Sequence, residues 1–186
     1  MNSGVRRRTR LNFFASSHRR MVAALGLVAF CTLPSDLPGQ TASQPFHAWL
    51  TAGMGPSTFS SWPSLLFSGW LAYKGLALGV RRIDSSPSEN ADELVDRSVL
   101  LGGRVAFGPL LLTGAGGLSH TTGELSNGEQ SGTSTPIEPE NAPSVHAEAS
   151  FALTPFLGFG TAFFWTGGTR SRNTGWAVIA QLGALR

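Results

Sequence analysis

The stretches of chain that separate eight candidate strands alternate between long and short, and this order constrains the fold more than any other feature. The short stretches are Lys74-Gly75, Gly108-Pro109 and Pro155-Phe156, and the long ones are Gly55–Ser64, Asp84–Asp96, His120–Ser144 and Gly167–Thr174. A membrane-spanning barrel places tight turns at one rim and free loops at the other. The alternation therefore predicts an all-β fold, an eight-stranded antiparallel up-and-down transmembrane β-barrel.

Apolar residues recur with period two in the candidate strands, which indicates strands with two different faces. One face carries large apolar side chains, and the other is rich in glycine, alanine and serine. An eight-stranded barrel has room inside for modest side chains only, so we expect the small and polar face to line the interior. The candidate strands are His47–Met54, Leu65–Tyr73, Leu76–Ile83, Ser98–Phe107, Leu110–Ser119, Val145–Thr154, Leu157–Thr166 and Trp176–Leu185.

Acidic residues after position 43 gather in or beside two of the long stretches, and only Glu148 falls within a candidate strand. A bilayer imposes such segregation because a charge at its midplane costs about 2–4 kcal/mol. Glu148 shares the inner face with Arg81 and Arg104. We therefore predict a buried ion pair between Glu148 and one of these arginines, and the height of each residue above the short turns favours Arg81.

Aromatic residues lie where a membrane barrel has its two interfacial girdles. Trp165 and Trp176 flank the last long stretch, and Tyr73 lies beside a short turn. Interfacial belts of Trp and Tyr are typical of membrane barrels, although aromatic residues also favour strands in general. These three residues are the predicted girdle positions.

The third long stretch, His120–Ser144, is rich in Ser, Thr, Gly, Pro and Glu. Such a composition buries too little apolar surface to offset the entropy of ordering the chain. We expect this stretch to be mobile or disordered, and the segment Gly123–Asn141 to be dispensable for folding.

The N-terminal segment has the layout of a secretory signal. Six arginines precede a short apolar run, Met21–Leu33, and small residues follow it. The run is shorter than the roughly 20 apolar residues that span a bilayer, so we predict a cleaved signal peptide at residues 1–43 and one domain at 44–186. Met21 is an alternative start. Cys31 invites a lipoprotein interpretation, but Phe30 precedes it where a lipidation signal has a small residue.

Cleavage at that position would reverse the balance of charge. It removes six of the 14 basic residues and one of the 11 acidic ones, so the remaining chain is slightly acidic. Nucleic acid is then excluded as a partner, because its binding requires clustered Lys and Arg.

From Gln44 onward the chain resembles the small outer-membrane barrels of Gram-negative bacteria, the eight-stranded OmpA/OmpX-like group. The resemblance lies in the signal segment, the eight alternating strands, the short turns beside both termini and the long acidic loops opposite. It implies a monomer in the outer membrane, surrounded by lipid and lipopolysaccharide and inserted by the barrel-insertion machinery, with long loops facing outward. Such barrels usually end in an aromatic residue, whereas this chain ends Leu185-Arg186.

Two alternatives to a binding or structural membrane barrel are a soluble lipocalin-like barrel and a lipid-modifying enzyme. A soluble lipocalin-like barrel also has eight up-and-down strands, but the glycine-x-tryptophan mark near its first strand is absent, since His47 stands two residues before Trp49. A lipid-modifying enzyme would need a catalytic set. His146, Glu148 and Ser150 share one strand face, but neighbours on such a face stand about 6–7 Å apart, beyond hydrogen-bond reach.

The sequence therefore predicts a structural or surface-interaction barrel that works through its long loops. No catalytic, cofactor-binding or metal-binding residues are assigned and no cofactor is expected, because the histidines are scattered and no Cys/His cluster occurs. An open pore is not expected either, because interior Trp70, Phe164 and the charged side chains would fill an eight-stranded lumen.

Overall fold

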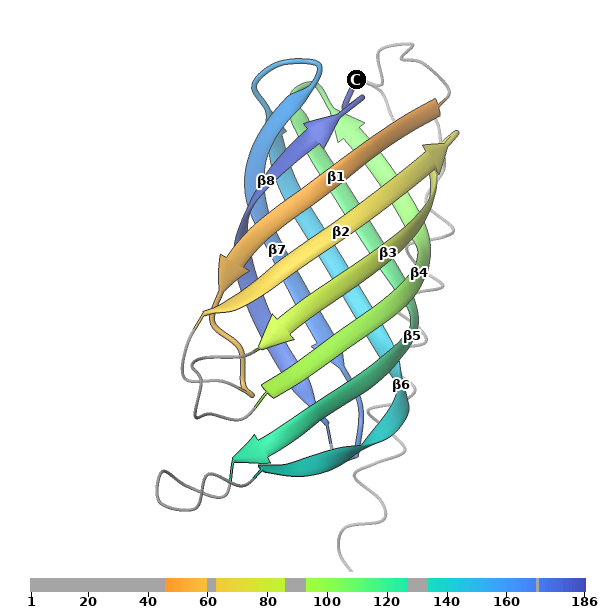
Figure 1. Ribbon diagram of the computed structural model, residues 1–186. Helices are drawn as coiled ribbons and strands as arrows, with labels where there is room; N and C mark the ends of the chain where they lie inside the picture. Colours follow the sequence, from red (N-terminus) through yellow and green to blue (C-terminus); the bar gives the residue numbers. More distant parts are fainter. Residues whose placement is uncertain (1–45, 60–62, 86–92, 127–133, 170) are drawn as a thin grey trace, which may run out of the picture. The chain divides into compact units, whose positions relative to one another are not determined.

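The computed structural model describes residues 46–59, 63–85, 93–126, 134–169 and 171–186, and the predicted signal peptide lies outside them. The described residues form a closed barrel of eight antiparallel strands that pair in sequence order, with β8 returning to β1 (Figure 1). This confirms the predicted barrel fold. The strands are β1 (Phe46–Gly55), β2 (Ser64–Tyr73), β3 (Leu76–Ser85), β4 (Glu93–Phe107), β5 (Leu110–Ser126), β6 (Ser134–Ala152), β7 (Leu157–Thr166) and β8 (Asn173–Gly183).

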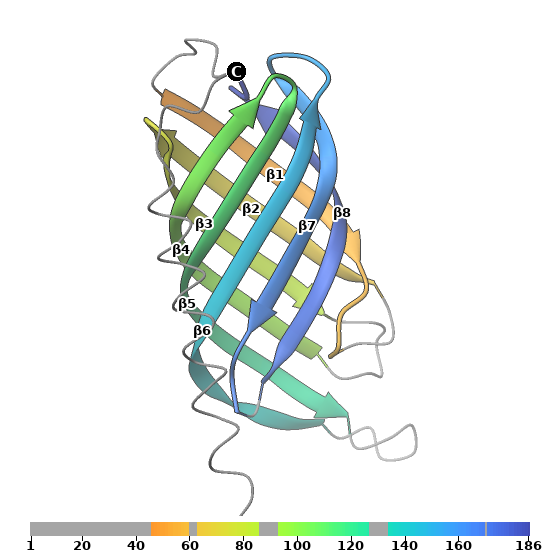
Figure 2. The same cartoon turned by 180° about the vertical axis from the view of Figure 1, so that it is seen from behind.

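The short connections lie at one rim of the barrel, and the chain ends at the same rim (Figures 1 and 2). Lys74 and Gly75 have φ angles of 49° and 85°, which is the pair of positive angles that a two-residue hairpin turn of type I′ requires. Gly108 has a φ of 59° in the second turn. No helix in the described part of the chain is long and apolar enough to cross a membrane.

Side chains alternate between the two faces as the period-two pattern predicts. Large apolar side chains are exposed on every strand, and the alternate, buried positions hold small and polar side chains together with several large apolar ones that the pattern did not predict. In β2, for example, Leu65, Phe67 and Leu71 are exposed, whereas Leu66 and Trp70 are buried. The barrel therefore has an apolar outer belt and a filled interior.

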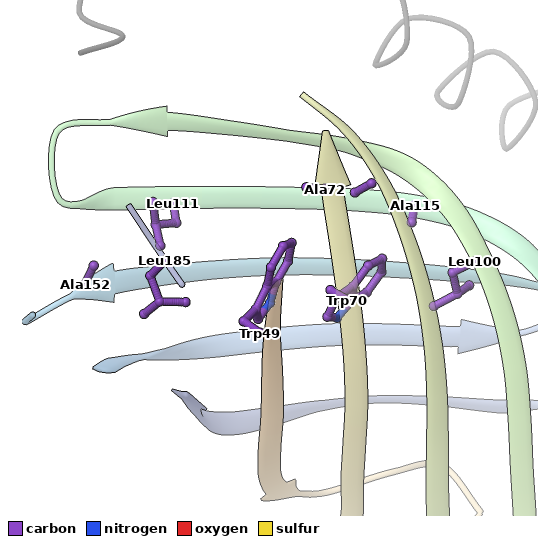
Figure 3. Close-up of a cluster of buried hydrophobic side chains, with 9 residues drawn as sticks. Trp49, Trp70, Ala72, Leu100, Leu111, Ala115, Ala152 and Leu185 are labelled. Atoms are coloured by element: carbon purple, nitrogen blue, oxygen red, sulfur yellow. The ribbon is translucent and has the colours of Figure 1, made fainter. Parts of the chain in front are cut away.

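A cluster of buried apolar side chains fills the interior near the short turns. Trp49 and Trp70 stack there with ring centroids 5.9 Å apart and planes at 12° (Figure 3). Gly79 makes room for the Trp70 ring, because a Cβ atom at position 79 would stand 2.3 Å from Trp70 Cε3. Leu100, Leu111, Ala115, Ala152 and Leu185 surround the two rings.

The third long connection differs from its prediction. β5 extends to Ser126 and β6 begins at Ser134, so much of the stretch expected to be disordered forms a paired extension of the hairpin. Backbone pairing between the two strands orders these polar residues without requiring an apolar core, and Ile137 is buried within the extension. Residues 127–133 lie outside the described residues.

The longer strands also change the placement of the acidic residues. Asp84, Glu93 and Asp96 lie in β3 and β4, and Glu124, Glu138 and Glu140 lie in β5 and β6. The expectation that only Glu148 falls within a strand is therefore wrong. Most of these residues lie near the loop-side strand ends, but Asp96 is fully buried inside the barrel.

We expect the outermost part of the β5–β6 hairpin to be dispensable for folding. Replacing Leu125–Thr135 with Asn-Gly joins Glu124 to Pro136, which are register partners, through a turn that suits the twist of a hairpin. Because Leu125 and Thr135 are exposed, the free energy of unfolding should fall by about 1 kcal/mol or less. Urea unfolding of the refolded protein in detergent measures this. The larger deletion of Gly123–Asn141 should lower the free energy of unfolding clearly more. Equal losses for the two deletions would contradict the paired β5–β6 extension.

Candidate functional site

A buried polar network occupies the interior on the loop side of the tryptophan pair. Its centre is an ion pair between Arg81 of β3 and Asp96 of β4, with 3.3 Å between Arg81 Nη2 and Asp96 Oδ2 and both side chains fully buried. The Asp96 carboxylate also accepts hydrogen bonds from the hydroxyls of Ser98, Ser119 and Thr166. These donors come from β4, β5 and β7, so the carboxylate connects strands that are not neighbours.

The Arg81 guanidinium also binds groups on the opposite wall of the barrel. It donates to the Ser144 hydroxyl at 2.7 Å and to the Val145 carbonyl at 3.0 Å, and it lies 5.9 Å from the centre of the Phe164 ring. These bonds engage Nη1 and Nη2, whereas the buried Nε has no hydrogen-bond partner. The pairing matters because a buried charge costs several kcal/mol unless it is paired and hydrogen-bonded. The network thereby connects β3 and β4 with β5, β6 and β7 across the interior.

Arg81, Arg104 and Glu148 all lie inside the barrel, as their face parity predicts, but the pairing that was expected for Glu148 is corrected. Arg81 binds Asp96, whereas Glu148 accepts hydrogen bonds from Ser68 at 3.3 Å and Gln181 at 2.8 Å. The sequence did contain a signal for Asp96, which stands two residues before Ser98 on the inner face of the same strand. The predicted strand begins at Ser98, so Asp96 was expected in a loop and not on the inner face of β4.

The polar set on β6 forms only part of a catalytic arrangement. His146 Nε2 lies 2.9 Å from Glu148 Oε1, which is closer than the strand spacing predicted. Ser150 instead donates its hydroxyl hydrogen to Gln181 Oε1 at 2.6 Å. All three side chains are buried. The serine is therefore not activated by the histidine, and the set lines the interior.

Arg104 closes the short-turn end of the interior. Its guanidinium lies 4.1 Å from the centre of the Trp49 ring and donates to the Leu185 carbonyl at 2.5 Å. β8 ends at Gly183, earlier than predicted, and Gly183 has a φ of 146°. Leu185 is buried beyond this point, so its side chain packs into the barrel and the strand does not continue.

The predicted girdle residues lie on the outer face. Tyr73 and Trp176 are exposed and Trp165 is partly buried. Trp165 of β7 pairs in register with Val145 of β6 and Thr174 of β8, close to the loop-side rim. Tyr73 lies at the opposite rim, where the Lys74 ammonium stands 5.4 Å from its ring centre.

The loop-side rim is cross-linked by polar contacts. Glu140 of the β5–β6 extension accepts hydrogen bonds from the Thr169 amide at 2.8 Å and the Thr169 hydroxyl at 2.7 Å. Near β1, Ser57 pairs with Gly175, and the Thr58 amide donates to the Thr174 carbonyl at 2.8 Å. Segments of three connections are thus attached to the strands beside them. Among the described residues, no group of three His, Cys, Asp or Glu side chains is placed to hold a metal ion.

Solved structures of outer-membrane barrels share this fold. Neisserial surface protein A is 15% identical with a TM-score of 0.52, over 75% of this chain and 97% of that one. The N-terminal β-barrel domain of Pseudomonas aeruginosa OprF is 10% identical with a TM-score of 0.54, over 75% and 98% of the two chains. Ail, the attachment invasion locus protein of Yersinia pestis, is 11% identical with a TM-score of 0.53, over 74% and 97%.

At these identities the likeness concerns the fold, which is that of the small eight-stranded outer-membrane barrels, as the resemblance of the sequence implied. No family model matches the sequence, and no curated protein matches it. The Yersinia protein has also been solved in complex with the heparin analogue sucrose octasulfate.

Proposed function

We propose that the chain is an integral barrel of the bacterial outer membrane with a structural or surface-interaction role, and that its loop-side rim is the working surface. The observation that carries the proposal is the inverted distribution of side chains. Leu50, Val80, Val99, Leu118 and Leu182 are each about 60–70% exposed, whereas charged Arg81, Asp96 and Glu148 are buried. Exposing so large an apolar belt to water is unfavourable, and hydrocarbon removes this cost.

The same distribution argues against a soluble ligand-binding barrel of the lipocalin type. Such a barrel keeps water outside and encloses one ligand. Here the stacked Trp49 and Trp70, the Arg81–Asp96 pair and Phe164 occupy the interior. The filled interior also favours a protein that does not conduct large solutes, because eight strands leave room inside only for side chains.

A lipid-modifying activity is the alternative, and the His146–Glu148 pair is its best support. A binding role is favoured because these side chains face the interior and Ser150 donates its hydroxyl hydrogen to Gln181. Loops on a stable scaffold usually carry recognition, and the cross-linked rim holds segments of three connections in fixed positions. One fold neighbour, the Yersinia protein, binds a sulfated sugar, which supports a surface-interaction role for barrels of this shape.

Cysteine labelling in intact cells tests both the membrane placement and the orientation. We expect Arg172→Cys, at the loop-side rim, to react with a maleimide attached to a polyethylene glycol too large to cross the outer membrane. Lys74→Cys, at the short-turn rim, should react only after the cells are opened. Both variants replace an exposed cation, and both are made with Cys31→Ser. Labelling of Lys74→Cys alone in intact cells would show that the short-turn rim faces outward. Equal labelling of both variants in intact cells would contradict the membrane placement.

A further inference from the structure

One row across the outside of the barrel places two arginines on adjacent strands. Arg82 of β3 and Arg97 of β4 are register partners, and His120 of β5 and Asn141 of β6 continue the same row. All four side chains are exposed. Neighbouring strands stand about 4.8 Å apart, so the two arginines leave the sheet side by side. We refer to these four residues as the basic row.

The charges of the basic row are not balanced within the described part of the protein. Like charges directly opposite each other on paired strands are destabilising. Arg82 is compensated directly by Asp84, to which its Nε donates at 2.8 and 3.1 Å, and the Glu93 carboxylate adds a weaker favourable charge interaction. No hydrogen bond or ion pair of the Arg97 guanidinium is found among the described residues. One positive charge of the pair therefore remains available to an external anion.

The other two members of the row add hydrogen-bonding capacity. His120 Nδ1 lies 2.9 Å from Asn141 Oδ1. With the imidazole donating to that oxygen, the amide nitrogen of Asn141 is left to donate outward. The row thus presents guanidinium and amide donors along one line, which suits an anion with several oxygen acceptors.

The basic row marks the loop-side edge of the apolar belt. Two residues closer to the short turns on each strand stand Val80, Val99 and Leu118, all of them exposed and paired in one row. On the loop side stand the carboxylates Asp84 and Glu93. The surface therefore changes from apolar to cationic to anionic along the strands, and the cationic level directly borders the belt.

Strand tilt places Arg97 at the height of the predicted girdle. Trp165 lies in one register row with Leu101, three strands away. The rows descend toward the loops from β4 to β7, as the loop-side strand ends do from β1 to β5 in Figure 1. At a tilt of about 40°, three strand steps descend about 9 Å. The four residues from Leu101 to Arg97 descend about 10 Å. Arg97 and Trp165 therefore lie at one level, the expected lipid headgroup level.

We propose that the basic row binds the phosphate groups of lipopolysaccharide in the outer leaflet, an inference that rests on the proposed membrane placement and orientation. Guanidinium groups match the geometry of phosphate oxygens, and a phosphate between Arg82 and Arg97 removes their mutual repulsion. The acyl chains of the same lipid lie against Val80, Val99 and Leu118. The ligand therefore combines a phosphorylated headgroup and hydrocarbon in the order in which the barrel surface presents cations and apolar side chains.

Binding of lipid A that carries both phosphates tests the proposal, measured by native mass spectrometry of the refolded barrel released from detergent. We expect Arg97→Gln to weaken binding about tenfold and the double variant with Arg82→Gln to weaken it about a hundredfold, since each lost charge-assisted contact is worth about one factor of ten. Asp84→Asn should strengthen binding, because it removes the carboxylate that competes for Arg82. Lys74→Gln, which removes an exposed cation at the other rim, should leave binding unchanged.

The controls distinguish a failure of the phosphate-binding site from a failure of the proposed membrane placement and orientation. Each variant must first show the gel mobility shift between boiled and unboiled samples, and labelling as described above tests the membrane placement independently. With the barrel folded and correctly oriented, equal losses in Lys74→Gln and Arg97→Gln would overturn the site, because only total charge would then matter. Equal binding of lipid A without phosphates, or of phosphatidylglycerol, would overturn the assignment of lipopolysaccharide phosphate as the ligand.

Discussion

Asp96→Asn should lower the free energy of unfolding by about 3–5 kcal/mol, which is the usual cost of leaving one partner of a buried ion pair without the other. The variant keeps the shape of the side chain but removes the negative charge that Arg81 and three hydroxyl donors share. Reversible urea unfolding of the protein in detergent or lipid vesicles, followed by tryptophan fluorescence, measures the change.

Asp84→Asn is the matched control for the loss of a carboxylate that pairs with arginine. The Arg82–Asp84 pair is exposed, with 51% and 25% of the two side chains accessible, and exposed pairs contribute about 0–1 kcal/mol. A double variant, Arg81→Met with Asp96→Leu, should cost less than the two single changes together, because no charge is then left buried. Similar effects of Asp96→Asn and Asp84→Asn would mean that water reaches the network.

Trp70→Ala should lower the free energy of unfolding by about 3–5 kcal/mol, as expected when a large buried aromatic ring is removed from a packed interior. The ring stacks on Trp49, lies 5.4 Å from the centre of the His146 ring, and donates its indole hydrogen to Ser68 at 2.9 Å. Unfolding in urea again gives the value, with Trp49 and the remaining tryptophans as the fluorescent probes.

Gly79→Ala tests the same packing from the opposite side. In the native chain its Cβ would stand 2.3 Å from the Trp70 ring, so the substitution should be strongly destabilising. Combined with Trp70→Ala it should cost much less, because the new methyl group then enters empty space. Strictly additive effects of the two substitutions would show that Gly79 is needed for the backbone and not for the tryptophan.

Local patterns in the sequence were enough to identify the architecture. The number of strands follows from the order of long and short connections, and the orientation of each strand face follows from a period of two residues. Both patterns are set by adjacent residues, and the exposed Leu65 beside the buried Leu66 shows how sharply neighbours are distinguished. The interior location of Arg81, Arg104 and Glu148 follows from the same parity.

The partners across the interior were decided by the tertiary structure alone. Which residues face each other in a closed barrel depends on the strand tilt and on the register of every strand pair. The closing pair, β1 with β8, joins the two ends of the barrel sequence, and no local pattern gives its register. For this reason Arg81 binds Asp96 and not Glu148, and Glu148 binds Gln181 on β8. The β5–β6 extension was hidden for a related reason, since its polar residues are ordered by backbone pairing that composition does not reveal. The sequence by itself determined the scaffold and its two faces, whereas the ion pairs and the extended rim required the closed barrel.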